Sequence, residues 1–527
     1  MNLDHTNRTL RSKKVHVTFL ILISFFVNSY YANLGVFPLD TFLHFDSAYR
    51  ILNGESPIKD YWIVHGIFID YLQAFLFRLF GLNWNIYVMH ASLFNLMICV
   101  FTYFFLINLG LNKNYSFLFG ISLALLGYTS SGTPFIDHHA AFLCFIGIFL
   151  LVRGIREKNN WILIIFPFFF GFAFLSKQVP TSYIIISTSL AILYYTIIKR
   201  NYNYTIYPLI GSILFILFLS IFFYFEKITY TSFFEQYILF PMSIGSERYS
   251  NFNVSIMHLI SHFKFIIITF MPILIFMIIK IKKSRKFFKE ENFFICLIFL
   301  TATFGLIFHQ VITNNQTFIF FLIPINAGLS IIFINKLNLK KKNIYILAIF
   351  LVCFASTFKY HMRFNEGRKF HELASVNLKD AIPAKIIDKK LKQLQWITPH
   401  FIDPKSEVDL IKKTINIIEN DNNPIMLISN YLFLDALTKK NLNSPSRTYD
   451  SISFPMTKNK YYYSYKKLLE EKIKNKQIKS IYIFEHQVVS DKIIQIYIYQ
   501  YLNKSCFMKN EILPQLIRLD LTKCQKI

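Results

Sequence analysis

Residues 66–81 have the sequence GIFIDYLQAFLFRLFG, and this segment decides how the chain is threaded through a membrane. It is apolar along most of its length but is interrupted by Asp70, Gln73 and Arg78. If the segment spans the membrane, every later basic cluster falls outside the cytoplasm. If it lies along the interface as an amphipathic helix, every cluster falls inside.

The rest of the chain has the composition of a membrane protein. Of its 527 residues, 54% are hydrophobic, 18% are aromatic and only 16% are charged. The apolar residues form uninterrupted runs that are long enough to cross a lipid bilayer as helices. Soluble globular and disordered proteins are therefore excluded, and the sequence predicts an α-helical polytopic membrane protein.

The basic residues that give the chain its net charge of +26 are distributed unevenly between the two sides of the membrane. With residues 66–81 in the interface, 20 Lys and Arg lie on the cytoplasmic side and only seven in the opposite loops. This asymmetry agrees with the positive-inside rule. If residues 66–81 span the membrane instead, most of the asymmetry is inverted. The basic residues therefore indicate orientation, and we expect no nucleic-acid partner.

We expect about 11 transmembrane helices, with a cytoplasmic N-terminus and a location in the inner (plasma) membrane. They form a predicted domain over residues 1–358, in which residues 38–84 make an outer loop with interfacial helices. The predicted spans lie near 15–37, 85–109, 115–133, 139–152, 161–176, 180–198, 205–225, 265–280, 293–308, 317–335 and 343–358.

Residues 359–527 have no run long enough to span, and the odd number of spans places them outside the cytoplasm. Helix-like stretches at 408–419 and 461–474 alternate with strand candidates at 425–429, 481–484 and 516–519, which predicts an extracytoplasmic α/β domain. This part contains no phosphate-binding loop, dinucleotide turn or zinc spacing. Cys506 and Cys524 are the only cysteines that we expect to pair.

Polar side chains at the predicted outer ends of the spans form the candidate site, because ionisable groups near membrane depth are retained mainly along a cavity or pathway. A carboxylate can accept a proton from an acceptor, while Lys, Arg and His can hold a phosphate. The set comprises His44, Asp46, Asp60, His65, Asp137, His138, His139, Lys177, Gln178, Glu247, Arg248, His309 and Gln310.

Structural interpretations of the same residues stay open. Asp46 is in a loop where acids are usually solvated, and Asp137 begins a span that it can cap. Lys177 can extend to the interface, and His309 can be a satisfied polar group of the bundle. The histidines lack zinc spacing, so we expect no metal or other cofactor, with Mg or Mn at the carboxylates as a weaker alternative.

The stretch 46–60, DSAYRILNGESPIKD, is followed by His65-Gly66 and by an amphipathic helix that ends in FRLFG at 77–81. This pattern resembles the first outer loop of the GT-C glycosyltransferases, closest to their protein mannosyltransferase and aminoarabinose transferase branch (family 39-like). The resemblance covers roughly residues 15–360. It implies that Asp46 is the catalytic base and matches Tyr49 and the Lys59-Asp60 pair to the family pattern.

Two further positions resemble the family. Asp137 matches an aspartate at the outer start of a span, and Lys177-Gln178 matches a Ser-Lys-Gln turn. The second residue of the mannosyltransferase Asp-Glu pair is Ser47 here, and the aminoarabinose transferase Lys-Pro-Pro motif is absent. The resemblance therefore implies neither a particular sugar nor a particular acceptor.

We expect a cell-envelope glycosyltransferase that uses a polyprenyl-phosphate-linked sugar, contacts membrane lipids and modifies a lipid, glycan or protein acceptor. Asp46 and Asp137 are the expected catalytic residues. Asp46 takes the acceptor proton, Lys177, with Arg248 or His139 as weaker candidates, binds the donor phosphate, and Asp137 and Asp60 orient the sugar or the loop.

Three other functions remain open at this stage. A glycan polymerase or ligase with a diphosphate-linked donor is expected to place Arg or His in a large outer loop, as Arg248 and His258 do in part. A lipid-linked glycan transporter is expected to have charges through the middles of several spans and an internal repeat. A non-catalytic membrane scaffold is the third.

Overall fold

The computed structural model describes every residue except 1–2, 251–254, 314–316, 439, 451 and 522–527. It is 71% helical. Contacts divide the chain into two compact units, neither of which is continuous in sequence. Unit 1 comprises Met1–Ala32, Val88–Leu219 and Phe252–Phe370, and unit 2 comprises Asn33–Tyr87, Ser220–Asn251 and His371–Ile527.

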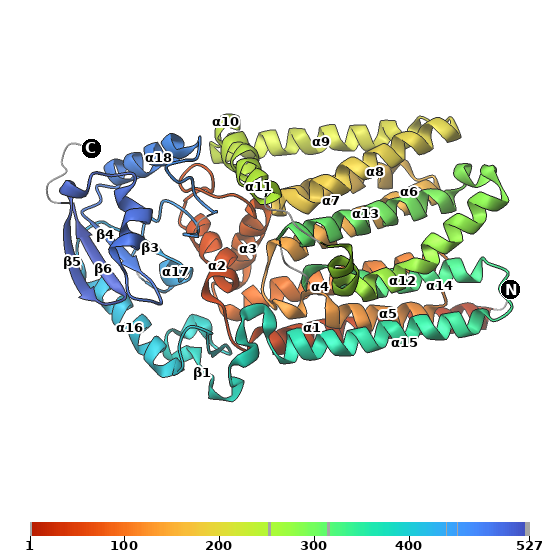
Figure 1. Cartoon of the computed structure of the whole chain (residues 1–527), viewed down its shortest axis with the longest axis horizontal. Helices are drawn as coiled ribbons and strands as arrows, with labels where there is room; N and C mark the ends of the chain where they lie inside the picture. The colour runs from red at the N-terminus through yellow and green to blue at the C-terminus, as the bar shows by residue number, and fades with distance from the viewer. Residues whose placement is uncertain (1–2, 251–254, 314–316, 439, 451, 522–527) are drawn as a thin grey trace. The chain divides into compact units, whose positions relative to one another are not determined.

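Unit 1 is built from long helices that run beside one another (Figure 1). They are α1 (Leu3–Ala32), α4 (Trp84–Asn108), α5 (Lys113–Leu126), α6 (Ile136–Glu157), α7 (Asn160–Ser176), α8 (Gln178–Lys199), α9 (Asn203–Glu226), α12 (Ile256–Lys283), α13 (Glu291–Thr313), α14 (Leu322–Asn335) and α15 (Lys342–Tyr360). Two of these, α4 and α9, also contribute residues to unit 2.

Eight helices in the described part of the chain are long and apolar enough to cross a membrane. The prediction of a helical polytopic membrane protein is therefore confirmed. Each of the predicted spans falls on a helix, but α7 and α14 are shorter apolar helices and α5 has only 14 residues. The count of 11 spans stays a prediction.

Burial separates the centre of this bundle from its periphery. The apolar window of α6 is 89% buried, whereas that of α9 is 22% buried and leaves apolar side chains exposed. A methyl group on Gly211 of α9 would lie 2.1 Å from the carbonyl oxygen of Ile164 in α7. Only glycine permits these two helices to approach this closely.

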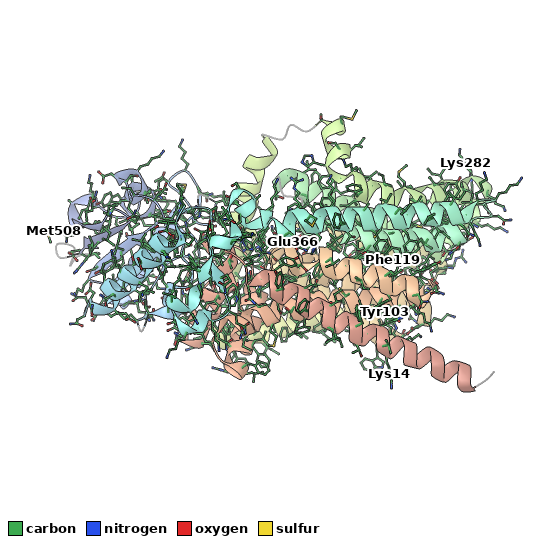
Figure 2. The ribbon with its side chains drawn as sticks, turned by 90° about the horizontal axis from the view of Figure 1, so that it is seen from below. Lys14, Tyr103, Phe119, Lys282, Glu366 and Met508 are labelled. Carbon is green, nitrogen blue, oxygen red and sulfur yellow. The ribbon has the colours of Figure 1, made fainter. Side chains whose placement is uncertain are left out.

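Basic residues collect at one end of unit 1. Arg156 near the end of α6 pairs with Glu291 at the start of α13 at 3.1 Å, and α12 ends in a lysine-rich turn. Figure 2 places Lys282 at the end of the helices opposite to Glu366. Since α6 begins at Ile136 and α13 ends at Thr313, Asp137 and His309 lie at the end opposite to this basic cluster.

Unit 2 contains a four-stranded sheet in the order β3-β4-β6-β5. Strand β3 (Ile425–Ser429) pairs in parallel with β4 (Ser480–Phe484), and β6 (Leu516–Asp520) lies antiparallel between β4 and β5 (Met508–Leu513). The predicted strands at 425–429, 481–484 and 516–519 correspond to β3, β4 and β6. Helices α16 (Pro404–Asn420) and α18 (Tyr462–Asn475) correspond to the two predicted helical stretches.

The first loop of the chain shares a hydrophobic core with these C-terminal elements. Trp62 and Val64, which follow α2 (Pro38–Leu52), and Phe240 of α11 (Phe240–Ser250) pack in one buried cluster with residues of β3, β4 and α18. Unit 2 is therefore assembled from three separated segments. A 2-stranded sheet of β1 (Ile382–Pro383) and β2 (Gln395–Trp396) and the short helix α17 (Leu434–Leu437) complete it.

Residues 66–81 form helix α3 (Ile67–Phe80), which belongs to unit 2 and is not among the candidate spans. Its polar residues Asp70 and Gln73 are completely buried, whereas Phe75, Leu79 and Phe80 are more than half exposed. The helix thus buries polar groups in protein and presents apolar ones outward, which suits contact with lipid. Its interfacial position stays a prediction.

Candidate functional site

Asp46 lies on α2, a helix whose first turn begins with Pro38 and Asp40 and whose last turn carries Arg50, as the helix dipole favours. Its side chain is buried, with only 4% of the residue exposed. Burial, reinforced by the charge of Asp435, raises the pKa of Asp46 well above its usual range. A carboxylate with a raised pKa is a stronger base than an ordinary one.

Asp435 is the carboxylate that faces Asp46 across a small cavity, which Ser446 and Tyr449 also line. It lies on α17 and accepts a hydrogen bond from the backbone N–H of Leu442 at 3.0 Å. Burial raises the pKa of Asp435 to about 6. Two buried acids therefore share one polar cavity, an arrangement in which one proton is readily held between the pair.

Arg50 lies one turn after Asp46 on the same helix, but it binds a different carboxylate. Its Nε donates to Glu55 at 2.6 Å, because the Asn53-Gly54 turn brings Glu55 back over the end of α2. Its Nη2 donates to the carbonyl oxygen of Ser444 at 2.7 Å. Its guanidinium lies 3.6 Å from the ring centroid of Tyr61.

Glu55 is held between two cations. Lys472 of α18 donates to it at 3.0 Å from the side opposite to Arg50. Although burial favours the protonated acid, the charges of Arg50 and Lys472 lower the pKa of Glu55 to about 2. Burial lowers the pKa of Lys472 to about 8. These ion pairs attach the end of α2 to the C-terminal elements of unit 2.

A larger cavity of about 310 Å³ adjoins this network. Asp435 lines it as well as the smaller cavity of Asp46. Its lining residues are Tyr49, Arg50, Asn53, Glu55, Asp435, Lys440 and Asn441. The predicted site residues Asp46 and Tyr49 are therefore both brought to Asp435.

Asp70 of α3 is the centre of a second buried polar group. It accepts from His44 at 2.6 Å and from Arg447 at 2.8 Å. Arg447 also contacts the predicted residue His65, donating to its carbonyl oxygen at 2.6 Å. These contacts hold α2, α3 and the loop before α3 to the C-terminal segment, which makes His65 part of a structural junction.

The predicted pair Lys59 and Asp60 lies at the turn after α2, where the carbonyl oxygen of Asp60 accepts from Lys472 at 2.8 Å. Asp60 accepts the backbone N–H of Ser56 at 2.7 Å and lies 3.5 Å from the half-exposed ammonium of Lys59. Neither residue lines the cavities of Asp46 and Tyr49. The pair therefore shapes the turn that follows α2.

Unit 1 brings three of the predicted residues together. Lys177, at the junction of α7 and α8, donates to both oxygens of Asp137 at 2.8 and 2.7 Å. His309 of α13 lies 3.2 Å from the same carboxylate. Asp137 and His309 are buried, and Lys177 is 19% exposed. Because Asp137 already neutralises Lys177, a phosphate can bind there only by joining or displacing that carboxylate.

The neighbouring histidines belong to a separate buried group. His139 lies 3.0 Å from His90 of α4, and its other nitrogen contacts the hydroxyl of Tyr128. His138 stacks on the Tyr128 ring with centroids 4.7 Å apart. As adjacent helical residues, the two histidines point in different directions.

Two predicted residues are placed only in part. Gln178 begins α8 beside Lys177. Arg248 lies on α11, and its side chain is outside the described part of the structure, as is that of His258. Among the described residues, no group of three or more His, Cys, Asp or Glu has an arrangement that could hold a metal ion.

Sequence reasoning missed Arg50, Glu55, Asp435, Lys440 and Lys472. Arg50 could have been found, because its spacing of four residues from Asp46 places both on one face of a helix. Glu55 lies five residues after Arg50 in the same loop and was also within reach of local reasoning. Asp435, Lys440 and Lys472 could not have been found, since nothing local relates the loop after the first span to charges near the C-terminus. Comparison with known proteins finds no matching family profile and no significantly similar curated protein.

Proposed function

We propose that the protein is an integral membrane glycosyltransferase that moves a sugar from a polyprenyl-phosphate donor to a lipid, glycan or protein acceptor. The observation that carries this proposal is the buried carboxylate of Asp46, which lines a polar cavity of a helical membrane protein. Burial and the charge of Asp435 raise the pKa of this carboxylate. The resemblance of residues 46–60 to the GT-C first outer loop supports the same assignment.

In this mechanism Asp46 accepts the proton of the acceptor hydroxyl. The acceptor oxygen then bonds to the anomeric carbon of the sugar as the bond from that carbon to the phosphate oxygen breaks. Polyprenyl phosphate leaves with the electron pair. The charge of Asp435 raises the pKa of Asp46 and so strengthens it as a base, which makes Asp435 a positioning residue.

The Asp137, Lys177 and His309 group is the proposed contact for the donor phosphate. Lys177 and His309 supply hydrogen-bond donors, and Asp137 orients them through its two oxygens. A donor with a lipid tail suits a unit whose outer helices present apolar side chains. The end of unit 1 that carries these residues is opposite to the basic clusters, which the positive-inside rule assigns to the cytoplasm.

A disulfide supports an outer location for the C-terminal part. Cys506 is disulfide-bonded, whereas Cys99, Cys144, Cys296 and Cys353 are free and buried. Its predicted partner, Cys524, lies outside the described residues. Disulfides persist mainly in oxidising compartments, so we propose that this part, an α/β domain with 11 spans before it, is extracytoplasmic.

The test is transfer by the purified full chain in lipid nanodiscs. Polyprenyl-phosphate sugars labelled in the sugar are supplied with envelope lipid and glycan extracts, and label is followed into the acceptor fraction. We expect transfer by the wild type and by Asp40→Asn, a control on the same helix that lines neither cavity. Label that moves only from diphosphate-linked donors, or that never reaches the acceptor fraction, contradicts the proposal.

A further inference from the structure

The cavity beside Tyr49 has the size and lining of a small-molecule site. At about 310 Å³ it lies at the lower end of the range for such sites, roughly 300–1,000 Å³. All of its lining residues belong to unit 2, and the groups that line it are mostly polar. The roles proposed for Asp46, Lys177 and their neighbours assign no ligand to this cavity.

Two cationic groups on its wall have no hydrogen-bond partner among the described residues. They are Nη1 of Arg50 and Nζ of Lys440, and both atoms are buried. Arg50 is 4% exposed, and its other two nitrogens donate hydrogen bonds to Glu55 and to the carbonyl oxygen of Ser444. A buried donor without a partner is unfavourable, the more so when it is charged, and an anion entering the cavity can accept hydrogen bonds from both groups.

The charges around the cavity leave room for one more negative group. Arg50 and Lys440 line the cavity with two carboxylates, Glu55 and Asp435, and the neighbouring Asp46 also acts on Arg50. Glu55 is already bound on both of its oxygens, and Asp435 accepts the backbone N–H of Leu442. Neither Glu55 nor Asp435 pairs with Lys440, so its ammonium stays available to an anionic group.

The remaining lining groups fit a sugar. Tyr49 is half-buried and offers part of a ring, and Asn53 and Asn441 are exposed amides at the cavity. The nitrogen of Asn53 donates to the Tyr49 carbonyl oxygen, and the oxygen of Asn441 accepts from the Asn443 backbone. Each amide thus keeps its other polar atom for hydroxyl groups, which both donate and accept hydrogen bonds.

We propose that this cavity binds an anionic saccharide, a sugar unit bearing a carboxylate or a phosphate, with Arg50 and Lys440 contacting the charged group. The inference rests on the proposed function, since it names the acceptor class of that reaction. Asp435 lines both this cavity and that of Asp46, so a sugar held here extends toward the proposed base.

Binding is measured directly on the full chain in detergent, without a polyprenyl donor, by ligand-observed NMR. The probes are glucuronate, glucose 6-phosphate, glucose and inorganic phosphate. We expect the two anionic sugars to bind at least tenfold more tightly than glucose and than inorganic phosphate. Lys440→Met should remove this preference, and Lys413→Met, at an exposed lysine of α16 away from the cavity, should retain it.

Asn441→Asp provides a second variant at an exposed position, where folding is not at risk. It should weaken binding of both anionic sugars more than that of glucose, because it adds a negative charge to the lining of the cavity. Equal affinities for glucose and glucuronate overturn the proposal, as does a preference that survives Lys440→Met. Inorganic phosphate binding as tightly as glucose 6-phosphate overturns the saccharide assignment. Because no transfer is needed, binding without transfer contradicts the proposed function alone.

Discussion

At the scale of single residues, the carboxylate of Asp46 is the group whose removal should reduce sugar transfer most. A positioned base typically contributes about 10²–10⁴ in rate. Asp46→Asn keeps the shape of the side chain and removes its ability to accept a proton. We expect this variant to fold and to lose at least about two orders of magnitude in transfer in the nanodisc assay. If Asp46→Asn is fully active and Asp137→Asn is inactive, the catalytic base is Asp137 of unit 1 and our assignment is wrong.

The carboxylate pair predicts a specific pH dependence. Asp46 acts only when deprotonated, and the negative charge of Asp435 raises its pKa. Asp435→Asn removes that charge, so the pKa of Asp46 falls and the acidic limb of the kcat/KM profile moves to lower pH. The measurement is kcat/KM from pH 4 to pH 9 for both proteins. An acidic limb that does not move would assign Asp435 a purely structural role.

At the scale of elements, the connection between α2 and α18 is a buried ion pair. Glu55→Gln leaves Lys472 and Arg50 buried beside a neutral group, and breaking a buried pair costs about 3–5 kcal/mol. We expect a clearly lower thermal transition in detergent.

The matched control for that connection lies on α18 itself. Glu471 pairs with Lys467 at 3.9 Å and is 60% exposed. Glu471→Gln should change stability by less than about 1 kcal/mol, as exposed pairs do. Equal effects of the two substitutions would mean that the Glu55 network contributes no more than a surface pair.

Helix α3 makes a second prediction at this scale. Its exposed Phe75, at 56%, faces away from the buried Asp70. A benzophenone amino acid replacing Phe75 in native membranes should cross-link to phospholipid on illumination. The same group replacing Tyr463 of α18, which is 77% exposed, should not. Lipid adducts at both positions, or at neither, would contradict an interfacial α3.

The same helix marks the limit of sequence reasoning. Its apolar content and its polar interruptions left both a span and an interfacial helix possible, and the distribution of Lys and Arg over the later loops favoured the interfacial helix. The direction of its polar face was not predictable, because Asp70 pairs with Arg447, 377 residues later. Local periodicity carries no information about such a partner. The helices of unit 1 and the strands β3, β4 and β6 were predictable because apolar runs determine them locally. Strand β5 contains Lys509, Asn510 and Glu511 in sequence and has no buried residue.

At the scale of the whole molecule, orientation is the testable property. The native free cysteines are buried, so a new surface thiol is labelled against a low background. Ile402→Cys, at a fully exposed position, should react with a membrane-impermeant maleimide in intact spheroplasts. Lys340→Cys, beside the basic end of α14, should react only after lysis. The reverse pattern would place the Asp137 end of unit 1 in the cytoplasm.

The discontinuity of unit 2 imposes an order on biosynthesis. The ribosome releases His44, Arg50, Glu55 and Asp70 early, but Arg447 and Lys472, which complete their ion pairs, emerge only near the end of translation. Until then the loop after the first span holds charges that its finished fold buries. A chain that terminates early therefore displays unneutralised polar groups and open hydrophobic surface around Trp62, which membrane proteases can distinguish from the completed protein.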